Sequence, residues 1–85
     1  MWIFNTIKFR IIEKFILDYW YIKNKQEGSH IKYKNFWKTL IIPKHKEISR
    51  STINNIFKII SFHNWMNKTD IEQNFLEFYN KKWKK

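Results

Sequence analysis

The sequence contains no cysteine, and glycine and proline occur once each, as Gly28 and Pro43. Without cysteine, neither a disulfide nor a thiolate metal site can stabilise the fold. A single glycine also excludes a glycine-rich phosphate-binding loop, because such loops need several glycines at fixed spacing. A chain this small is therefore expected to depend on its hydrophobic core together with a bound partner.

Acidic residues are scarce, since seven carboxylates stand against 17 lysines and arginines and leave a formal net charge of +10. This excess predicts a polyanionic partner, with nucleic acid favoured over an anionic membrane surface. Long apolar runs are missing too. The longest stretch without a formal charge covers nine residues, Ile59 to Asn67, whereas a bilayer span needs about 20. We therefore expect no transmembrane segment.

The three histidines, His30, His45 and His63, are too widely spaced in the sequence to suggest a metal site. The carboxylates stand at intervals that are ordinary for helix surfaces. We therefore expect no metal, no cofactor, no small-molecule substrate and no catalytic centre. By this argument the chain is not an enzyme.

Aromatic residues make up 20% of the 85 residues, far more than a disordered basic tail contains. The chain is therefore expected to fold, as a single small basic domain over residues 1–85. Apolar residues at helical spacing predict a helix from Lys8 to Ile22. Residues 24–46, rich in lysine and aromatic residues, are predicted to be a basic connection with a short strand, and residues 81–85 a basic tail.

Residues 53–65 fit two kinds of secondary structure. As a helix they place Ile53, Ile56, Phe57 and Ile60 on one face, whereas as a strand they alternate between two faces. Their β-branched and aromatic content favours the strand, followed by a turn at Asn67 and a return strand over residues 69–75. The competing interpretation is a helix that begins at the capping box of residues 69–72.

The segment Ile48-Ser49-Arg50-Ser51-Thr52-Ile53 sets a guanidinium and three hydroxyls between two isoleucines. These are groups that bind phosphate oxygens, although the same run could cap a helix or form a polar loop. It is similar to the start of the recognition helix in helix-turn-helix DNA-binding regulators. Pro43, Lys46 and Glu47 depart from that pattern, because proline is unsuited to the interior of the preceding helix.

Several segments also follow the order found in one ribosomal family. Residues 7–17 keep the lysine, the acid and the apolar frame of a Trp-Lys-Gly-Pro/Ser-Phe-Val-Asp-x-x-Leu-Leu opening, and residues 48–53 are similar to Trp-Ser-Arg-Arg-Ser-(Ser/Thr)-Ile. Residues 65–68 then correspond to aromatic-Asn-Gly-Lys, and residues 80–83 to Gly-His-Lys-(Leu/Phe). In these motifs the chain resembles small-subunit ribosomal protein nineteen.

This resemblance implies an α+β fold with an N-terminal helix packed on a small antiparallel β-sheet, the alternative being an all-α helix-turn-helix domain. It implies a structural role in the small ribosomal subunit, bound to rRNA in the head and beside small-subunit protein thirteen. It also implies that residues 53–65 form a strand. The expected RNA-binding residues are Lys8, Ser49, Arg50, Ser51, Thr52, Lys68, Lys81, Lys82, Lys84 and Lys85.

Residues with AT-rich codons dominate and tryptophan occurs five times, which suggests an AT-rich genome and a code with a second tryptophan codon, as in many mitochondria. Glu13 and Asp18 argue against a cleaved presequence. We therefore expect a mitochondrial, organelle-encoded protein. The alternatives are a DNA-binding regulator of an AT-rich phage or mobile element, in the cytoplasm of a bacterium or phage host, and a peripheral subunit of an organellar membrane complex that uses residues 1–22 as an interfacial helix.

Overall fold

The computed structural model describes residues 5–82, which alternate between short strands and three helices. In chain order the elements are β1 (Thr6–Lys8), α1 (Phe9–Leu17), β2 (Ile22–Glu27), β3 (His30–Asn35), β4 (Lys38–Pro43), β5 (Glu47–Ser49), α2 (Arg50–His63) and α3 (Lys68–Lys82). Strands β2, β3 and β4 form an antiparallel sheet with β3 in the middle, and β1 pairs with β5 in a separate antiparallel ribbon.

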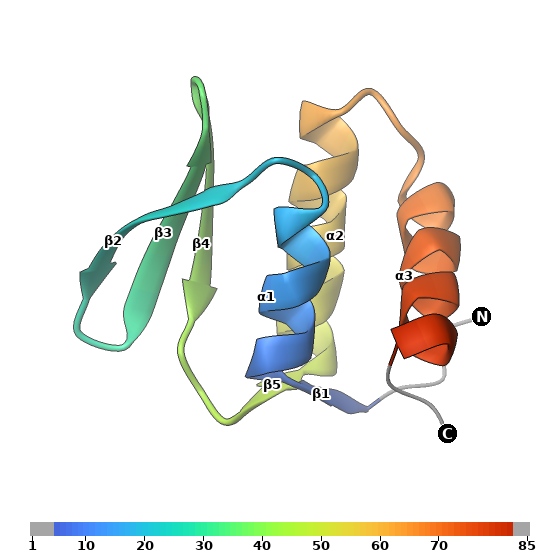
Figure 1. Cartoon of the computed structure of the whole chain (residues 1–85), viewed down its shortest axis with the longest axis horizontal. Helices are drawn as coiled ribbons and strands as arrows, with labels where there is room; N and C mark the ends of the chain where they lie inside the picture. The colour runs from blue at the N-terminus through green and yellow to red at the C-terminus, as the bar shows by residue number, and fades with distance from the viewer. Residues whose placement is uncertain (1–4, 83–85) are drawn as a thin grey trace.

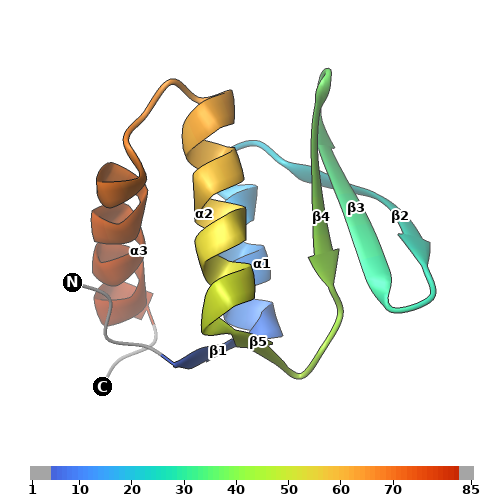
Figure 2. The ribbon, with the colours of Figure 1, turned by 180° about the vertical axis from the view of Figure 1, so that it is seen from behind.

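The elements form layers, with the three-stranded sheet on one side, α1 and α2 in the middle and α3 on the far side (Figure 1). The view from behind shows the same order, and the β1–β5 ribbon crosses beneath the first two helices (Figure 2). This arrangement confirms the predicted α+β fold, in which an N-terminal helix accompanies a small antiparallel sheet.

The sheet has one buried and one exposed face because its residues alternate along each strand. Ile31 and Tyr33 of β3 are opposite Ile42 and Leu40 of β4, and all four are buried beneath the helices. The hydroxyl of Tyr33 also donates a hydrogen bond of 2.6 Å to Glu13 of α1. Residues 24–46 thus contain more regular structure than their lysine-rich composition predicted, since Lys32 and Lys34 are outer residues of a two-faced sheet.

The strand prediction for residues 53–65 is wrong, because Arg50–His63 is the helix α2. Ile53, Ile56, Phe57 and Ile60 are all buried on one helical face. Burial at helical spacing outweighed the β-propensity of the isoleucines. The predicted turn at Asn67 and return strand at residues 69–75 are wrong for the same reason: α3 buries Ile71 and Phe75 one helical turn apart.

The first helix is shorter than predicted, since α1 ends at Leu17 and not at Ile22. Trp20, in the loop that follows, has a φ of +70°, a left-handed conformation that interrupts a right-handed helix. The apolar side of α1 enters the core through Ile11, Ile12, Phe15 and Ile16. These residues are therefore not available to lie in a membrane interface, and residues 1–4 of the segment predicted to do so lie outside the described part.

Phe15 is the centre of an aromatic cluster that joins the three helices. Its ring centroid lies 5.2 Å from that of Tyr19, 5.8 Å from Phe57 of α2, and 5.1 Å and 5.4 Å from Phe75 and Phe78 of α3. Most of these pairs are edge-to-face, the geometry that aromatic quadrupoles favour. In the part of the chain that the structure describes, no helix is long and apolar enough to span a bilayer.

Candidate functional site

The exposed face of the three-stranded sheet is basic. His30, Lys32 and Lys34 alternate with the buried residues of β3 and therefore point away from the helices. On β2, Lys25 is the Cα partner of Lys32 and forms a 3.0 Å ion pair with Glu27, which is the Cα partner of His30. A row of lysines thus follows β3 towards its last residue, with His30 at its first.

His30 lies at the end of this row, beside the β2–β3 turn, which hydrogen bonds hold in place. Gly28 has a φ of +60°, a conformation that glycine adopts without the strain that a side chain would bring. Its carbonyl accepts a hydrogen bond of 3.1 Å from the side chain of Gln26, and the carbonyl of Ser29 accepts one from the backbone N–H of Lys44. His30 itself is exposed and is the Cα partner of Pro43.

A basic pocket adjoins this turn, between the start of α1 and the connection from β4 to β5. It has a volume of about 390 Å³ and is lined by Lys8, Phe9, Arg10, Lys44, His45 and Lys46. The backbone N–H of Phe9 donates a 3.1 Å hydrogen bond to the carbonyl of Lys46, which holds the two walls together. Four cationic side chains and no carboxylate line the pocket, so it is suited to an anion such as phosphate.

The basic pocket and His30 belong to one end of the molecule. Lys44 lines the pocket and is hydrogen-bonded to Ser29, the residue before His30. His45 of the pocket lies two residues beyond Pro43, the partner of His30. Two exposed imidazoles and a set of cations are therefore gathered around a single turn of the sheet.

The third histidine, His63, has a structural role. It is 8% exposed, and its Nδ1 forms a 2.6 Å hydrogen bond with the hydroxyl of Tyr21. Burial lowers the pKa of His63, and the nearby charge of Lys38 lowers it further. Burial also raises the pKa of Tyr21 to about 12. Both groups are therefore neutral near pH 7 and link the α1–β2 loop to α2.

We expect the free energy of unfolding to fall as the pH is lowered below about 6.5, the ordinary pKa of histidine. The pKa of His63 is lower in the folded protein, so between the two pKa values the unfolded chain binds the proton more readily. His63 thus contributes stability that is present above the unfolded pKa and is lost as the pH falls towards the folded value. Urea unfolding between pH 5 and 8 measures this change of the free energy of unfolding with pH.

The control for this pH dependence is a pair of substitutions, His63→Asn and His45→Asn. The first removes the buried imidazole and should flatten the change of stability with pH, while the second removes an exposed imidazole and should preserve it. An equally steep pH dependence in the His63→Asn protein would show that another group causes it.

Ser49, one of the hydroxyl residues predicted to bind RNA, caps helix α2. Ser49 Oγ accepts a hydrogen bond of 3.5 Å from the backbone N–H of Thr52, as an N-cap residue does. The same Oγ lies 3.4 Å from Ser51 Oγ and donates to Thr52 Oγ1 at 3.2 Å. Arg50, the first residue of α2, is exposed beside this cap.

The predicted lysines are divided between two sides of the molecule. Lys8 lines the basic pocket. Lys68 forms a 3.5 Å ion pair with Glu72, and Lys68, Lys81 and Lys82 all belong to α3, which α1 and α2 separate from the sheet (Figure 2). Lys84 and Lys85 lie outside the described residues.

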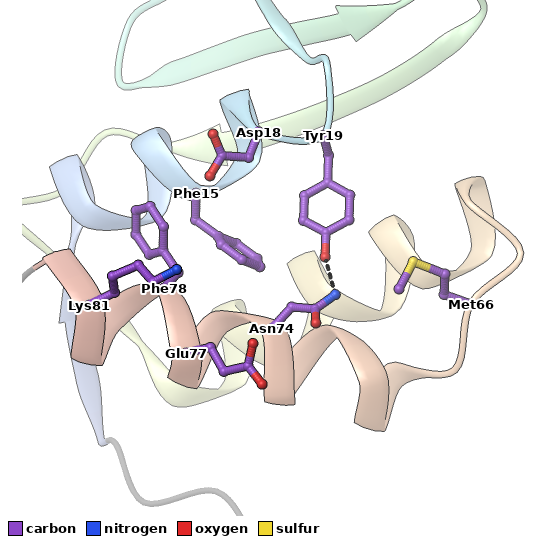
Figure 3. Close-up of a pocket in the computed structure, with 8 residues that line it drawn as sticks. All are labelled: Phe15, Asp18, Tyr19, Met66, Asn74, Glu77, Phe78 and Lys81. Carbon is purple, nitrogen blue, oxygen red and sulfur yellow. Dashed lines mark hydrogen bonds between the residues drawn. The ribbon is translucent and has the colours of Figure 1, made fainter.

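Lys81 lines a different hollow, of about 530 Å³, between α1 and α3 (Figure 3). Asp18 and Glu77 also line this hollow, and Tyr19 accepts a 2.9 Å hydrogen bond from Asn74 across it. Figure 3 shows the rings of Phe15 and Phe78 between the two helices. With two carboxylates at its wall, this hollow is less suited to a polyanion than the basic pocket.

Sequence reasoning missed His30, His45, Lys44 and Lys46. The histidines are widely spaced in the sequence, and the pairing of β3 with β4 brings the residues of the site together. The sequence held one local indication of this site: His30 follows the single glycine, Gly28, by two residues in a segment rich in lysine.

Residues 10–61 match the family model described as the HicA toxin of bacterial toxin–antitoxin systems. This segment contains most of α1, the whole three-stranded sheet, β5 and most of α2, so it includes His30 and His45. It leaves out His63 and α3. No curated protein and no solved structure matches the chain.

The match corrects the ribosomal interpretation. The chain is not small-subunit ribosomal protein nineteen, and rRNA of the small subunit and protein thirteen are not its partners. Structurally, two of the motifs on which that resemblance depended have other roles, because residues 49–52 are the N-cap and first turn of α2, and residues 65–68 lead from α2 into α3. The helix-turn-helix alternative has no more support than the ribosomal interpretation, because the strand β5 precedes α2 where that motif needs a helix.

The remaining corrections follow from the same match. The expectation that the chain is not an enzyme is wrong, because HicA toxins are endoribonucleases. The mitochondrial assignment is wrong, because the family is bacterial. The alternative of an organellar membrane complex has no more support than the ribosomal interpretation. Since the match covers more than half of the 85 residues, the chain belongs to the HicA toxin family.

Proposed function

We propose that the protein is a toxin that cleaves RNA, with His30 transferring the proton and the basic pocket holding a phosphate of the substrate. One observation carries this proposal: an exposed histidine stands at the end of a lysine row and next to a pocket with four cations. HicA toxins are mRNA-cleaving ribonucleases that are paired with an antitoxin, and we expect an antitoxin to restrain this protein.

RNA carries its own nucleophile, and this fits a site with an imidazole and cations. In the proposed step His30 takes the proton from a ribose 2′-hydroxyl, and the 2′-oxygen forms a bond to the neighbouring phosphorus. The bond from phosphorus to the 5′-oxygen breaks, and that oxygen takes up a proton from water as it leaves. The products are a 2′,3′-cyclic phosphate and a 5′-hydroxyl. Histidine is the side chain best suited to such proton transfer at neutral pH.

The cations of the basic pocket have two tasks in this step. They bind the substrate phosphate before reaction, and they stabilise the extra negative charge that develops on its oxygens in the transition state. Lys8, expected from the sequence to bind RNA, would do so here with Arg10, Lys44 and Lys46. Arg50, exposed at the start of α2, is a further candidate for a contact with the RNA backbone.

We expect the purified protein to cleave a mixed-sequence single-stranded RNA and to leave the DNA of the same sequence intact. DNA lacks the 2′-hydroxyl, so it cannot form the cyclic phosphate. Denaturing gel electrophoresis measures cleavage, and mass spectrometry identifies the new 3′ ends. Cleavage should weaken as salt rises, because cations of the protein displace counterions from the RNA.

Two results would contradict this proposal. Intact RNA in the presence of folded protein would remove the proposed activity, and equal cleavage of DNA would remove the proposed nucleophile. Protein with His30 replaced and purified in parallel excludes a contaminating ribonuclease, since a contaminant would cleave in both preparations.

A further inference from the structure

Three exposed aromatic residues adopt an unusual backbone conformation at the end of the molecule opposite the basic pocket. Trp20, Phe36 and Trp65 have φ values of +70°, +59° and +56°, and 80%, 90% and 96% of their surface is exposed. Bulky side chains rarely adopt positive φ, and strain of this kind gathers at functional sites. The three residues lie in separate connections: between α1 and β2, between β3 and β4, and between α2 and α3.

Two of these aromatic residues line a pocket. Trp20 and Phe36 contribute to a hollow of about 570 Å³ together with Ile22, Lys34 and Lys38. No carboxylate lines it, so its walls combine aromatic and apolar surface with two positive charges. Trp65 does not line it.

The pocket is connected with His30 along the exposed face of the sheet. Lys34 lines the pocket and is the last of the outward residues His30, Lys32 and Lys34 on β3, and Ile22 is its Cα partner on β2. His30 and Asn35 are the first and last residues of the strand, so His30 and the pocket are separated by the length of β3, about 17 Å at the usual rise per residue. A single strand lying along β3 on this face would meet Lys32 and Lys34 between His30 and the pocket.

We propose that this pocket binds a base of the RNA substrate, stacked on Trp20 or Phe36, while Lys32 and Lys34 contact the phosphates between that base and the cleaved bond. The proposal rests on the proposed ribonuclease function. Single-stranded RNA is bound in just this way elsewhere, by cations that follow the backbone and aromatic rings on which bases stack. The positive charge of the pocket favours RNA over an apolar segment of a protein partner.

The test uses Trp20→Asn and Phe36→Asn in protein whose His30 is replaced by alanine, so that the RNA stays intact. Asparagine tolerates the left-handed backbone, and the variants should therefore fold. Fluorescence anisotropy measures binding of a labelled oligouridylate. The substitution that removes the stacking ring should weaken binding by about tenfold, which corresponds to the loss of one stacked base.

Trp65→Asn is the matched control, because it also removes an exposed aromatic residue at positive φ but one outside the pocket. It should bind the oligouridylate as the parent does. A second control is an abasic oligomer of the same length: the parent, Trp20→Asn and Phe36→Asn proteins should all bind it equally.

Two results would overturn the base subsite. One is binding of oligouridylate by the Trp20→Asn and Phe36→Asn proteins as tight as that of the Trp65→Asn control. The other is a loss of antitoxin binding without a loss of RNA binding, which would make the pocket a protein-docking surface. Cleavage of RNA by the wild-type protein is measured separately, so that a failed subsite and a failed ribonuclease function are distinguished.

Discussion

Replacement of His30 by alanine should lower the rate of RNA cleavage by about 10²- to 10⁴-fold, the contribution of a positioned general acid or base. His30 is exposed at the start of β3 and contributes no side chain to the core. The loss should therefore occur in kcat/KM without a loss of folded protein. A fluorogenic RNA measures the rate, and circular dichroism with thermal unfolding measures the fold.

His45→Ala is the comparison for this prediction. The imidazole of His45 is also exposed, and it lines the basic pocket together with the cations. We assign His45 to phosphate binding, so its replacement should raise KM more than it lowers kcat. A larger loss of kcat in the His45→Ala protein than in the His30→Ala protein would transfer the catalytic role to His45. Full activity of the His30→Ala protein would remove His30 from the mechanism.

Replacement of Phe15 by alanine should lower the free energy of unfolding by about 3–5 kcal/mol, the usual cost of deleting a buried phenylalanine ring. That is a large part of the 5–15 kcal/mol typical of a whole domain. Phe15 is 2% exposed, and its ring meets rings of Tyr19, Phe57, Phe75 and Phe78. Urea unfolding followed by circular dichroism measures the change.

Phe15→Leu and Phe36→Asn are the controls for packing. Leucine keeps much of the buried volume and should cost less than alanine. Phe36 is 90% exposed, so its replacement should change stability by no more than about 0.5 kcal/mol. If Phe15→Ala lowered the free energy of unfolding no more than Phe36→Asn does, the contact between α1 and α3 would not be part of the stable core.

Aromatic content was sufficient to predict that the chain folds, and the α+β class was expected from the ribosomal resemblance, but the strands and helices were partly misassigned. The spacing of Ile53, Ile56, Phe57 and Ile60 was visible in the sequence, and so was the strand pattern of the same residues. Isoleucine dominates this chain and makes β-propensity a poor guide. Only the burial of one helical face decides between the two patterns.

The candidate site was harder to predict because it depends on strand pairing. Ser29 and Lys44 are far apart in the sequence and meet only when β3 pairs with β4. Lys8 was expected to bind RNA from the ribosomal resemblance, and the structure places it in the basic pocket. The hydroxyl of Ser49 was compatible with phosphate binding and with a helix cap, and it accepts the cap hydrogen bond from the backbone N–H of Thr52.

The position of α3 also has a practical consequence. This helix lies behind α1 and α2 as seen from the sheet (Figure 1), and Gln73 is exposed on it. Because the chain contains no cysteine, Gln73→Cys would introduce a unique thiol on the side away from the lysine row. A dye or a surface linker attached there would hold every molecule in one orientation and leave the face with His30 open to RNA.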